Sequence, residues 1–396
     1  MPGDATLIIA NAAIVDNAKI ISPAYLTLTD GIFTRVASTP PPKKEAHDIN
    51  LPQTLLLPGF VNAHCHLELT ALGPLPRNHF VPWVQDLLPR KVQLSADSIQ
   101  AGIRHGCELL LQSGVTTIID HISSETPLRF FENLPLSVIG FGEVLGVEKS
   151  RAEKSYQSLL DAKIQAPLPF HITPHAFYSL HADVMQAVLQ NESAPFSIHY
   201  LESAEEREFF ETQSGALWEF CRGGFQTRPN SRAGTLRAQV LEPAPTRSLL
   251  IHANEITDTD LVLIKKKQNT IVHCPGSFAF FKHKNFPHDK IRAAGIPIAL
   301  GTDSLASNFS LNFLDEIRRF VALFPPKDIF ELLPLITTNA LTALGINNAG
   351  KIAEGLPANL VGFNNPKELT PLHILQESQQ ADFVMTEKKR VVGHKT

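Results

Sequence analysis

The chain has 396 residues, of which 43% are hydrophobic and 19% are charged, and its formal net charge is −4. This composition is typical of folded globular proteins and excludes a collagen-like or largely disordered chain. Because the net charge is negative and basic residues form no long block, we expect no nucleic-acid partner.

The cysteines and the apolar runs favour a cytoplasmic protein. The four cysteines, Cys65, Cys107, Cys221 and Cys274, are scattered and include no CxxC pair. Such spacing is typical of reduced thiols rather than of a disulfide framework. We expect no secretion signal, because no basic segment precedes the first apolar run. We also expect no membrane span, because no uninterrupted apolar run reaches about 18 residues.

The first 54 residues are expected to form short strands. Residues 6–15, 18–22 and 24–38 are β-rich and are interrupted by Asp-Asn and Asp-Gly turn signals. A polar segment rich in proline and lysine, residues 39–48, follows as a loop.

Residues 55–350 alternate apolar β-runs with helical patterns, which is typical of a parallel sheet covered by helices. Eight β-runs are expected, at residues 55–61, 116–120, 137–145, 170–176, 196–201, 249–253, 270–274 and 296–301. The clearest helix has Ser95 as its N-cap and Gly114 as its stop. Because polar residues collect at the C-terminal ends of the runs, we predict a (β/α)8 TIM-type barrel rather than an open sheet.

Two segments are long enough to cover the mouth of this barrel. Residues 69–94, which include Phe80 and Trp83, form one candidate lid. Residues 203–246 form the other, with helices expected near 205–210 and 216–221 and a loop at 223–234.

Residues 351–396 again contain short β-rich pieces, at 355–364 and 382–393. Two β-rich ends that flank a different middle predict one small domain built from both. We therefore expect a β-sandwich formed by residues 1–54 and 351–396 beside the barrel of residues 55–350.

The first β-run ends in GFVNAHCHLE, where His64 and His66 are two residues apart. Because side chains alternate along a strand, these imidazoles point to one side and Cys65 points to the other. Two imidazoles at a barrel rim are suited to clamp a metal ion. An isolated HxH pair can also be incidental, so the residues at the other strand ends decide whether a metal site is expected.

Further histidines and one aspartate stand at the ends of the fourth to eighth runs. In chain order they are His175, His199, His252, His273 and Asp303. Chance does not readily place His or Asp at six of eight strand ends, so the pattern predicts one shared site. The four expected ligands are three imidazoles and one carboxylate: His64, His66, His199 and Asp303. This set suits one divalent ion, with Zn²⁺ expected and Fe²⁺ or Mn²⁺ as alternatives.

The remaining polar residues are expected to do chemistry on a water activated by the metal. Such a water has a pKa near 7, about the operating pH. Glu202, in SIHYLE, is placed to shuttle a proton from this water to a leaving group. His252 can orient the resulting hydroxide or stabilise the developing charge. His273 is expected to contact the substrate or to support a ligand from behind.

At these residues the sequence resembles the amidohydrolase superfamily, in particular its mononuclear deaminase and chlorohydrolase branch. LLPGFVNAHCHLE resembles the first-strand signature, GTDSLASNFSLNFLDEIR the eighth-strand signature, and KIAEGLPANLVGF the return to the terminal sheet. The resemblance covers essentially the whole chain. It implies the four ligands above, Glu202 as proton shuttle, His252 beside the hydrolytic water, and a homodimer. Binuclear members use a carboxylated lysine on the fourth strand, which FHITPHAF lacks, so one metal per subunit is expected.

The HxxE of the fifth strand end is similar to that of ring deaminases, which need a movable carboxylic acid. HCHLEL, PHAFYS and IHYLESAEE look most like aminofutalosine deaminases, which act on an adenine nucleoside in menaquinone biosynthesis. This resemblance implies a small-molecule substrate faced by His175, with Trp83 in the lid. Glu68 can reach ribose hydroxyls or a ring nitrogen, and it can equally form a salt bridge at the rim.

Two departures from the branch touch substrate recognition and leave the metal chemistry intact. Phe278 follows Ser277 where many relatives have Ser-Asn. The segment WVQDLLPRKVQL offers Asp86, Arg90 and Lys91 where adenosine-type deaminases often carry an acidic residue.

Several alternatives stay open. The same site can deaminate guanine, cytosine or another purine, or can release chloride or an alkylamine from a triazine. A non-catalytic, metal-bearing scaffold is a third hypothesis, although the complete set of site residues argues against it. His121 can line the pocket or pack, and Phe278, Phe280 and Phe281 can stack on a planar ring or belong to the core.

Overall fold

The computed structural model describes residues 6–16, 19–41, 48–76, 78–192, 195–225, 242, 244–387 and 389–392, with backbone only for 48, 222–225 and 389–392. Most of the loop expected at 223–234, from residue 226 onward, lies outside the described residues. Within the described residues, no helix combines the length and the apolar character needed to cross a membrane.

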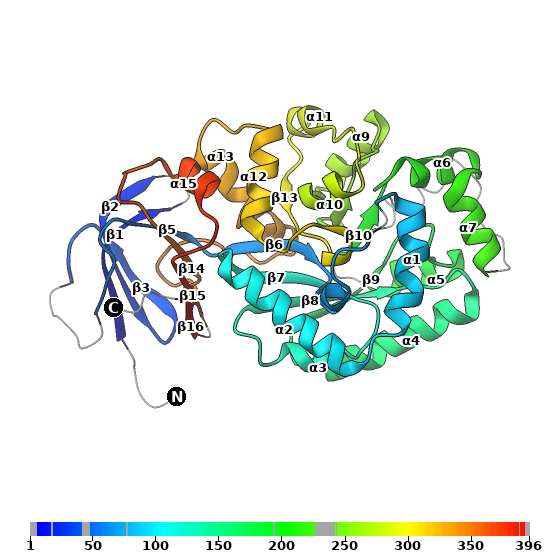
Figure 1. Ribbon diagram of the computed structural model, residues 1–396, viewed down its shortest axis with the longest axis horizontal. Helices are drawn as coiled ribbons and strands as arrows, with labels where there is room; N and C mark the ends of the chain where they lie inside the picture. The colour runs from blue at the N-terminus through cyan, green and yellow to red at the C-terminus, as the bar shows by residue number, and fades with distance from the viewer. Residues whose placement is uncertain are drawn as a thin grey trace.

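Strands from both ends of the chain form one mixed sheet. Its members are β1 (Thr6–Val15), β2 (Ile20–Thr29), β3 (Ile32–Ala37), β4 (Asp48–Asn50), β5 (Thr54–Pro58), β14 (Leu360–Asn364), β15 (Phe383–Thr386) and β16 (Lys389–Val392). The order is β16-β15-β14-β5-β1-β2-β3, with β4 beside β1. Figure 1 shows the blue N-terminal strands lying next to the red C-terminal ones. Strands from both ends of the chain therefore share one sheet.

The first predicted β-run, residues 55–61, is divided between two sheets. β5 pairs with β1 and β14 in the terminal sheet, whereas β6 (Phe60–Cys65) begins the parallel strands. Gly59 lies between them, where an added Cβ would come within 2.3 Å of Thr116 Oγ1. The expectation of a single strand was wrong, because the apolar pattern continues through a point where the chain changes sheets.

Eight parallel strands follow in two groups of four. The first group is β6, β7 (Val115–Ile122), β8 (Ser137–Val144) and β9 (Phe170–Pro174). The second is β10 (Ser197–Tyr200), β11 (Leu249–His252), β12 (Thr270–His273) and β13 (Ile298–Leu300). Isolated parallel bridges, Ala176 to His199 and Cys65 to Asp303, join the groups at both edges. The prediction of an α/β fold with parallel strands is confirmed.

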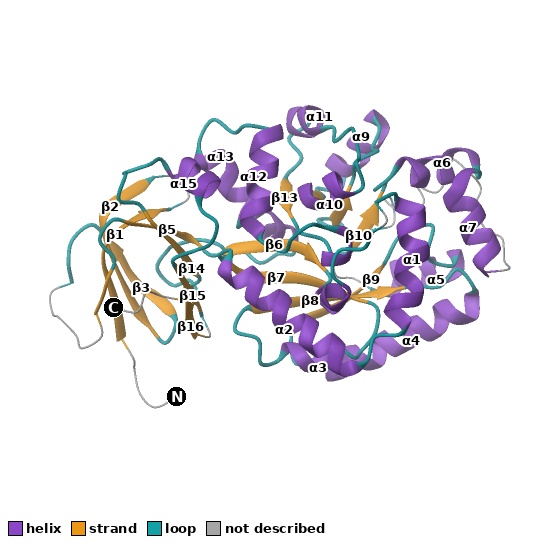
Figure 2. Cartoon of the chain, viewed as in Figure 1, coloured by secondary structure: helices purple, strands orange, loops and turns teal. Residues whose placement is uncertain are grey.

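Helices lie between successive parallel strands and surround them, as Figure 2 shows. The 3-10 helices are η1 (Leu67–Leu72) and η2 (Leu305–Ser307), and the α-helices of the first half are α1 (Phe80–Val92), α2 (Ala96–Gln112), α3 (Leu128–Phe131), α4 (Lys149–Gln165), α5 (Ala182–Asn191), α6 (Ala204–Thr212) and α7 (Gly215–Phe225). Those of the second half are α9 (Asp258–Lys266), α10 (Pro275–Phe280), α11 (His288–Ala293), α12 (Phe313–Leu323), α13 (Ile329–Ile336), α14 (Asn339–Ala343) and α15 (Pro371–Glu377). The two helices expected within 203–246 are α6 and α7.

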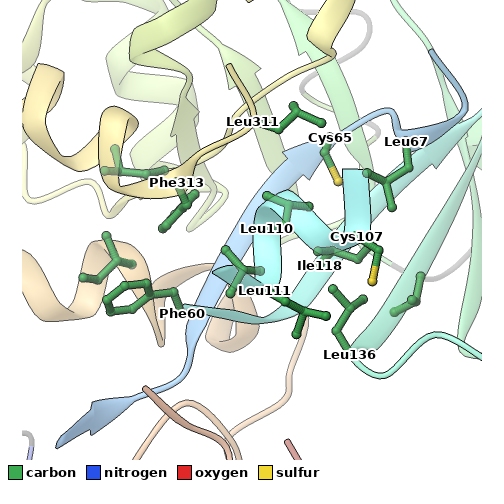
Figure 3. Packing of buried hydrophobic residues seen from close by; sticks show 14 of the residues in the cluster. Phe60, Cys65, Leu67, Cys107, Leu110, Leu111, Ile118, Leu136, Leu311 and Phe313 are labelled. Carbon is green, nitrogen blue, oxygen red and sulfur yellow. The ribbon is translucent and has the colours of Figure 1, made fainter. Parts of the chain in front are cut away.

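Helix α2 illustrates how the sequence pattern produces the packing. Ser95 accepts a hydrogen bond from the backbone N–H of Ser98 at 3.2 Å, which caps the helix as expected. Its buried stripe, which includes Cys107, Leu110 and Leu111, packs against β6 and β7 (Figure 3). Gly114 follows with φ +92°, a conformation that L side chains rarely adopt. The helix therefore ends where the chain must turn sharply into β7.

Candidate active site

The strand ends bring the expected polar side chains together. The ring centroid of His64 lies 4.8 Å from those of both His66 and His199, and that of His252 lies 5.5 Å from His199. Asp303 Oδ1 is 3.4 Å from His64 Nε2 and 3.8 Å from His66 Nε2. His64, His199 and His252 lie on β6, β10 and β11, and His66 and Asp303 follow the ends of β6 and β13. All five are buried.

The residue between the paired imidazoles faces away from them. Cys65 packs in the same apolar cluster as Leu67 and Cys107, beside α2 (Figure 3). The alternation read from HCH therefore holds, and Cys65 takes no part in the polar cluster.

Two of the strand ends bend through unusual backbone conformations. His252 has φ 68° and Asp303 has φ 59°, in the left-handed region that non-glycine residues rarely occupy. Each such residue costs on the order of 1 kcal/mol or more, and such costs cluster at functional sites. Here the bends turn both side chains toward the same imidazoles.

Hydrogen bonds determine which nitrogen of two imidazoles faces the cluster. His66 Nδ1 lies 3.0 Å from the backbone oxygen of His121, and His199 Nδ1 lies 3.2 Å from that of His175. Because a carbonyl only accepts, each Nδ1 carries the proton and each Nε2 keeps its lone pair. His64 Nε2 and His252 Nε2 are buried without a hydrogen-bond partner. Unpartnered nitrogens of this kind fit a bound cation.

The protonation states of the imidazoles suit metal binding. Burial lowers the pKa of His64 and His66 well below 6.5, and it also lowers the pKa of His199. All three are therefore neutral at neutral pH, which is the form that ligates a metal. Burial likewise lowers the pKa of His252 to about 3.

Asp303 is the one ionised group in the centre of the cluster. Burial raises the pKa of Asp303, but its interactions with the neighbouring imidazoles and the hydrogen bond from Ser277 lower it below 3.8 overall. Hydroxyls of Ser277 and Ser307 each donate to Oδ2 at 2.8 Å, and the N–H of Ser304 donates to Oδ1 at 2.8 Å. These donors hold the carboxylate with Oδ1 toward the imidazoles.

The ligand atoms lie close enough to hold one ion. The atoms of His64, His66 and Asp303 lie within 4.8 Å of one another, as do those of His64, His199 and His252. Imidazole nitrogens and carboxylate oxygens are ligands that Zn²⁺ accepts. The residues present therefore fit a divalent metal.

Glu202 lies beside this cluster, just past β10. Its Oε1 is 3.7 Å from His252 Nε2, and burial raises the pKa of Glu202 well above 4.5. Its backbone is held on both sides, because its N–H donates to Glu206 Oε2 at 2.8 Å and its oxygen accepts from Asn254 Nδ2 at 2.9 Å. A buried carboxyl with a raised pKa keeps its proton to a higher pH than an exposed one, so it can act as a general acid.

His175 and Glu68 lie near the ligands but already have protein partners. The ring of His175 is 4.5 Å from that of His199, and its Nδ1 is 2.8 Å from Ser179 Oγ. Glu68 is buried, and its Oε1 lies 2.5 Å from Lys91 Nζ. Glu68 therefore forms the salt bridge that was one of its two expected roles.

Trp83 connects α1 to the turn that follows Asp303. Its indole N–H donates to the oxygen of Ala306 at 2.8 Å, and its ring meets Phe281 edge-on at 5.2 Å. Because Trp83 is buried, its contacts join the first lid segment to η2.

His273 is not brought together with the others. Its ring stacks on Phe286 at 3.9 Å and lies beside Phe320 of α12, and both its nitrogens lack hydrogen-bond partners. Its neighbours Val272 and Cys274 pack with the strand residues of another apolar cluster. Because side chains alternate, His273 projects away from the metal-capable groups and toward the surrounding helices. Phe278, which follows Ser277, packs against this same ring.

The structure adds two residues to the site. Glu143, on β8, is buried with Oε1 3.4 Å from His199 Nδ1 and Oε2 4.0 Å from His66 Nδ1. His121, on β7, is buried with Nδ1 3.1 Å from His64 Nδ1. Glu143 was missed, although a carboxylate near the end of an apolar strand was a usable signal. His121 was expected either to line the pocket or to pack.

Comparison with known proteins finds a family and relatives that match most of this chain. The amidohydrolase family model matches residues 55–394. An aminodeoxyfutalosine deaminase from a Nitratiruptor species is 28% identical over 339 residues, 82% of this chain and 82% of that one. A 5-methylthioadenosine/S-adenosylhomocysteine deaminase from Pyrococcus furiosus is 30% identical over 334 residues, 78% of this chain and 75% of that one.

The fold is also shared with a solved structure. The crystal structure of Helicobacter pylori aminofutalosine deaminase in complex with methylthio-coformycin has a TM-score of 0.82. The match covers 97% of this chain and 100% of that one, at 22% sequence identity. Since the family model spans most of the sequence and the buried His/Asp cluster lies inside the matched region, this chain belongs to the amidohydrolase family.

Proposed function

We propose that this protein is a metal-dependent hydrolytic deaminase that removes the ring amino group of an adenine nucleoside. One observation carries the proposal: Glu202, a buried carboxyl with a raised pKa, lies beside a cluster of neutral imidazoles and one carboxylate. Hydrolysis of an aromatic C–NH2 bond needs a proton on the ring nitrogen and another on the departing amine. An acid held at this position can deliver both.

The proposed fold is a closed (β/α)8 barrel of residues 55–350, with a β-sandwich from residues 1–54 and 351–396. The bridges from Ala176 to His199 and from Cys65 to Asp303 support closure. So does an apolar cluster that joins residues of both strand groups, such as Phe141 and Ile251. In such a barrel, the C-terminal ends of the strands form the active face.

One divalent ion per subunit would be held by His64, His66, His199 and Asp303. Zn²⁺ is the proposed ion because three neutral imidazoles with one carboxylate match its usual ligands. When bound, such an ion lowers the pKa of water enough to provide a nucleophile at neutral pH.

The side chains around the ion would divide the remaining work. Glu202 would give its proton to the ring nitrogen and recover one from the attacking water, and it would then protonate the departing amine and recover the second proton of that water. His252, with Nε2 3.7 Å from Glu202 Oε1 and 4.0 Å from Asp303 Oδ2, would orient that water between the two carboxyl groups. Asp303 would stay ionised throughout, because its oxygens accept three hydrogen bonds from Ser277, Ser304 and Ser307.

Aminofutalosine, an adenine nucleoside of menaquinone biosynthesis, is the proposed substrate within this class. Support comes from the relatives, one of which is an aminodeoxyfutalosine deaminase and another a 5-methylthioadenosine/S-adenosylhomocysteine deaminase. Both names denote deaminases whose substrates carry adenine on a ribose-type sugar. Glu68, His175 and Trp83 are proposed to contact the substrate, and a homodimer is proposed from the family.

Assay of the Zn²⁺-loaded protein against a panel of amino compounds tests the proposal. The panel contains adenosine, 5′-methylthioadenosine, aminofutalosine, guanine, cytosine and a chlorotriazine, and ammonia, chloride and alkylamine are measured. We expect ammonia from the adenine nucleosides, with the highest kcat/KM for aminofutalosine, and no turnover after chelation. Chloride or alkylamine release from the triazine alone, or ammonia from guanine or cytosine alone, would overturn the substrate class. A metal-replete protein with no turnover on the whole panel would favour a non-catalytic role.

A further inference from the structure

We infer that His121 is a positioning residue that determines how both imidazoles of the HxH pair face the metal. Its ring accepts a hydrogen bond from the Nδ1–H of His64, and its backbone oxygen accepts one from the Nδ1–H of His66. This inference rests on the proposed metal site.

The geometry places His121 directly behind both ligands. His121 Nδ1 is 3.1 Å from His64 Nδ1, and the His121 oxygen is 3.0 Å from His66 Nδ1. The His64 and His121 ring centroids are 4.3 Å apart, and both side chains are fully buried. β7 pairs with β6 next to these residues, at Cys65 and Asp120, so the strand pairing itself sets the spacing.

The positions of the protons follow from counting them. A neutral imidazole carries one proton, and a ligand nitrogen carries none. His64 Nε2 lies 3.4 Å from Asp303 Oδ1 and faces the cluster, so with an ion bound the His64 proton must be on Nδ1. His121 Nδ1 is then the acceptor, and His121 must carry its own proton on Nε2.

The far side of His121 can receive that proton. Its Nε2 lies 2.6 Å from Ser197 Oγ on β10, so an Nε2–H donates to a hydroxyl oxygen. The ring also stacks on Phe141 of β8, at 5.4 Å and 14°. Three strands therefore hold this one imidazole in place. Both of its nitrogens are already engaged, which leaves none for a substrate.

The arrangement has a measurable consequence for metal affinity. Groups that orient a ligating histidine typically change metal affinity by about 10–100-fold when removed. His121→Phe keeps a flat ring against Phe141 but removes the acceptor for His64. His121→Asn keeps an acceptor close to the position of Nδ1. His171→Phe is the matched control, because His171 also packs on Phe141, at 5.1 Å, from β9, outside the metal-capable groups.

Zn²⁺ binding to the metal-free full-length proteins, measured by competition with a chromophoric chelator, tests the inference without using activity. We expect affinity to fall about 10–100-fold in His121→Phe, to recover at least in part in His121→Asn, and to stay at the wild-type value in His171→Phe. Equal affinity in His121→Phe and wild type would overturn the positioning role. Absence of Zn²⁺ binding by wild type would instead overturn the proposed metal site.

Nitrogen NMR of the Zn²⁺-loaded wild type gives a second measurement that needs no folded variant. We expect His64 and His66 to be protonated on Nδ1 and His121 on Nε2. A Zn²⁺-loaded protein in which His121 carries its proton on Nδ1 would refute the inference even if every substitution destabilised the fold.

Discussion

Replacing Glu202 with glutamine separates proton transfer from every other property of the site. Glutamine has nearly the shape of the protonated acid, which is the form favoured by burial. The contacts that hold this segment, from Glu206 and Asn254, use the backbone of Glu202 and therefore survive the substitution. The amide cannot take up or release a proton, so the substitution should slow the chemical step.

The expected loss can be stated as a rate. General acid–base catalysis contributes about 10²–10⁴-fold, so kcat should fall about 10³-fold, equivalent to about 4 kcal/mol. KM should change little, because a group acting only in the transition state affects kcat and kcat/KM equally. Metal content should stay at the wild-type level, since Glu202 is not among the four proposed ligands.

Ammonia release under steady-state conditions, with metal content measured on the same samples, provides the assay. Glu205→Gln is the matched control, because Glu205 lies three residues further along the same segment and is only partly buried. The control should keep the wild-type kcat. A Glu202→Gln enzyme with full metal content and a kcat within about tenfold of wild type would refute the proton-shuttle reasoning.

Three further predictions concern stability and metal binding. Burial raises the pKa of Glu316 from 4.5 to about 7, so its contribution to stability is fully present below pH 4.5 and is lost as the pH rises through 7. The free energy of unfolding, measured with denaturant, should fall by about 3 kcal/mol less in Glu316→Gln than in wild type as the pH rises through this range. Parallel pH profiles of the two proteins would contradict this prediction. In Gly301→Ala the new Cβ would lie 2.9 Å from His64 Cβ. Because overpacking costs about 1–3 kcal/mol, both the Zn²⁺ affinity and the thermal midpoint should fall. Wild-type values of both would exclude the clash. Removing the metal with a chelator should lower the thermal midpoint, because an ion at a hundred times its Kd stabilises the fold by about 2.7 kcal/mol, and an unchanged midpoint would argue against a specific site.

The amino-acid sequence was sufficient for the element types and for most members of the buried His/Asp cluster. Apolar β-runs alternating with amphipathic helices predicted the parallel strands, because burial on both faces of a strand requires an apolar run. The alternation of side chains predicted that His64 and His66 share a side and that Cys65 does not. His199, His252 and Asp303 were found because they end strands, and the ends of parallel strands meet at one edge of a sheet.

Two features depended on contacts between segments far apart in the chain. The division of residues 55–61 between two sheets depends on their hydrogen-bonding partners, which β5 finds in β1 and β14 and β6 finds in β7. His273 ends a strand as the other histidines do, but the phase of its alternation turns it toward Phe286 and Phe320. The alternation of side chains along a strand can be predicted locally. Which of its two faces points toward the site depends on how the strand sits in the whole sheet.

The supporting residues show the same division. Glu143 and His121 lie within apolar strands, where a single polar residue is as consistent with packing as with function. Glu143 lies 3.4 Å from His199, and His121 lies 3.1 Å from His64. Only these distances distinguish a role at the site from packing. Residue chemistry thus identifies what can bind a metal, but which nitrogen faces the ion depends on hydrogen bonds that form only when β7, β8 and β10 have come together.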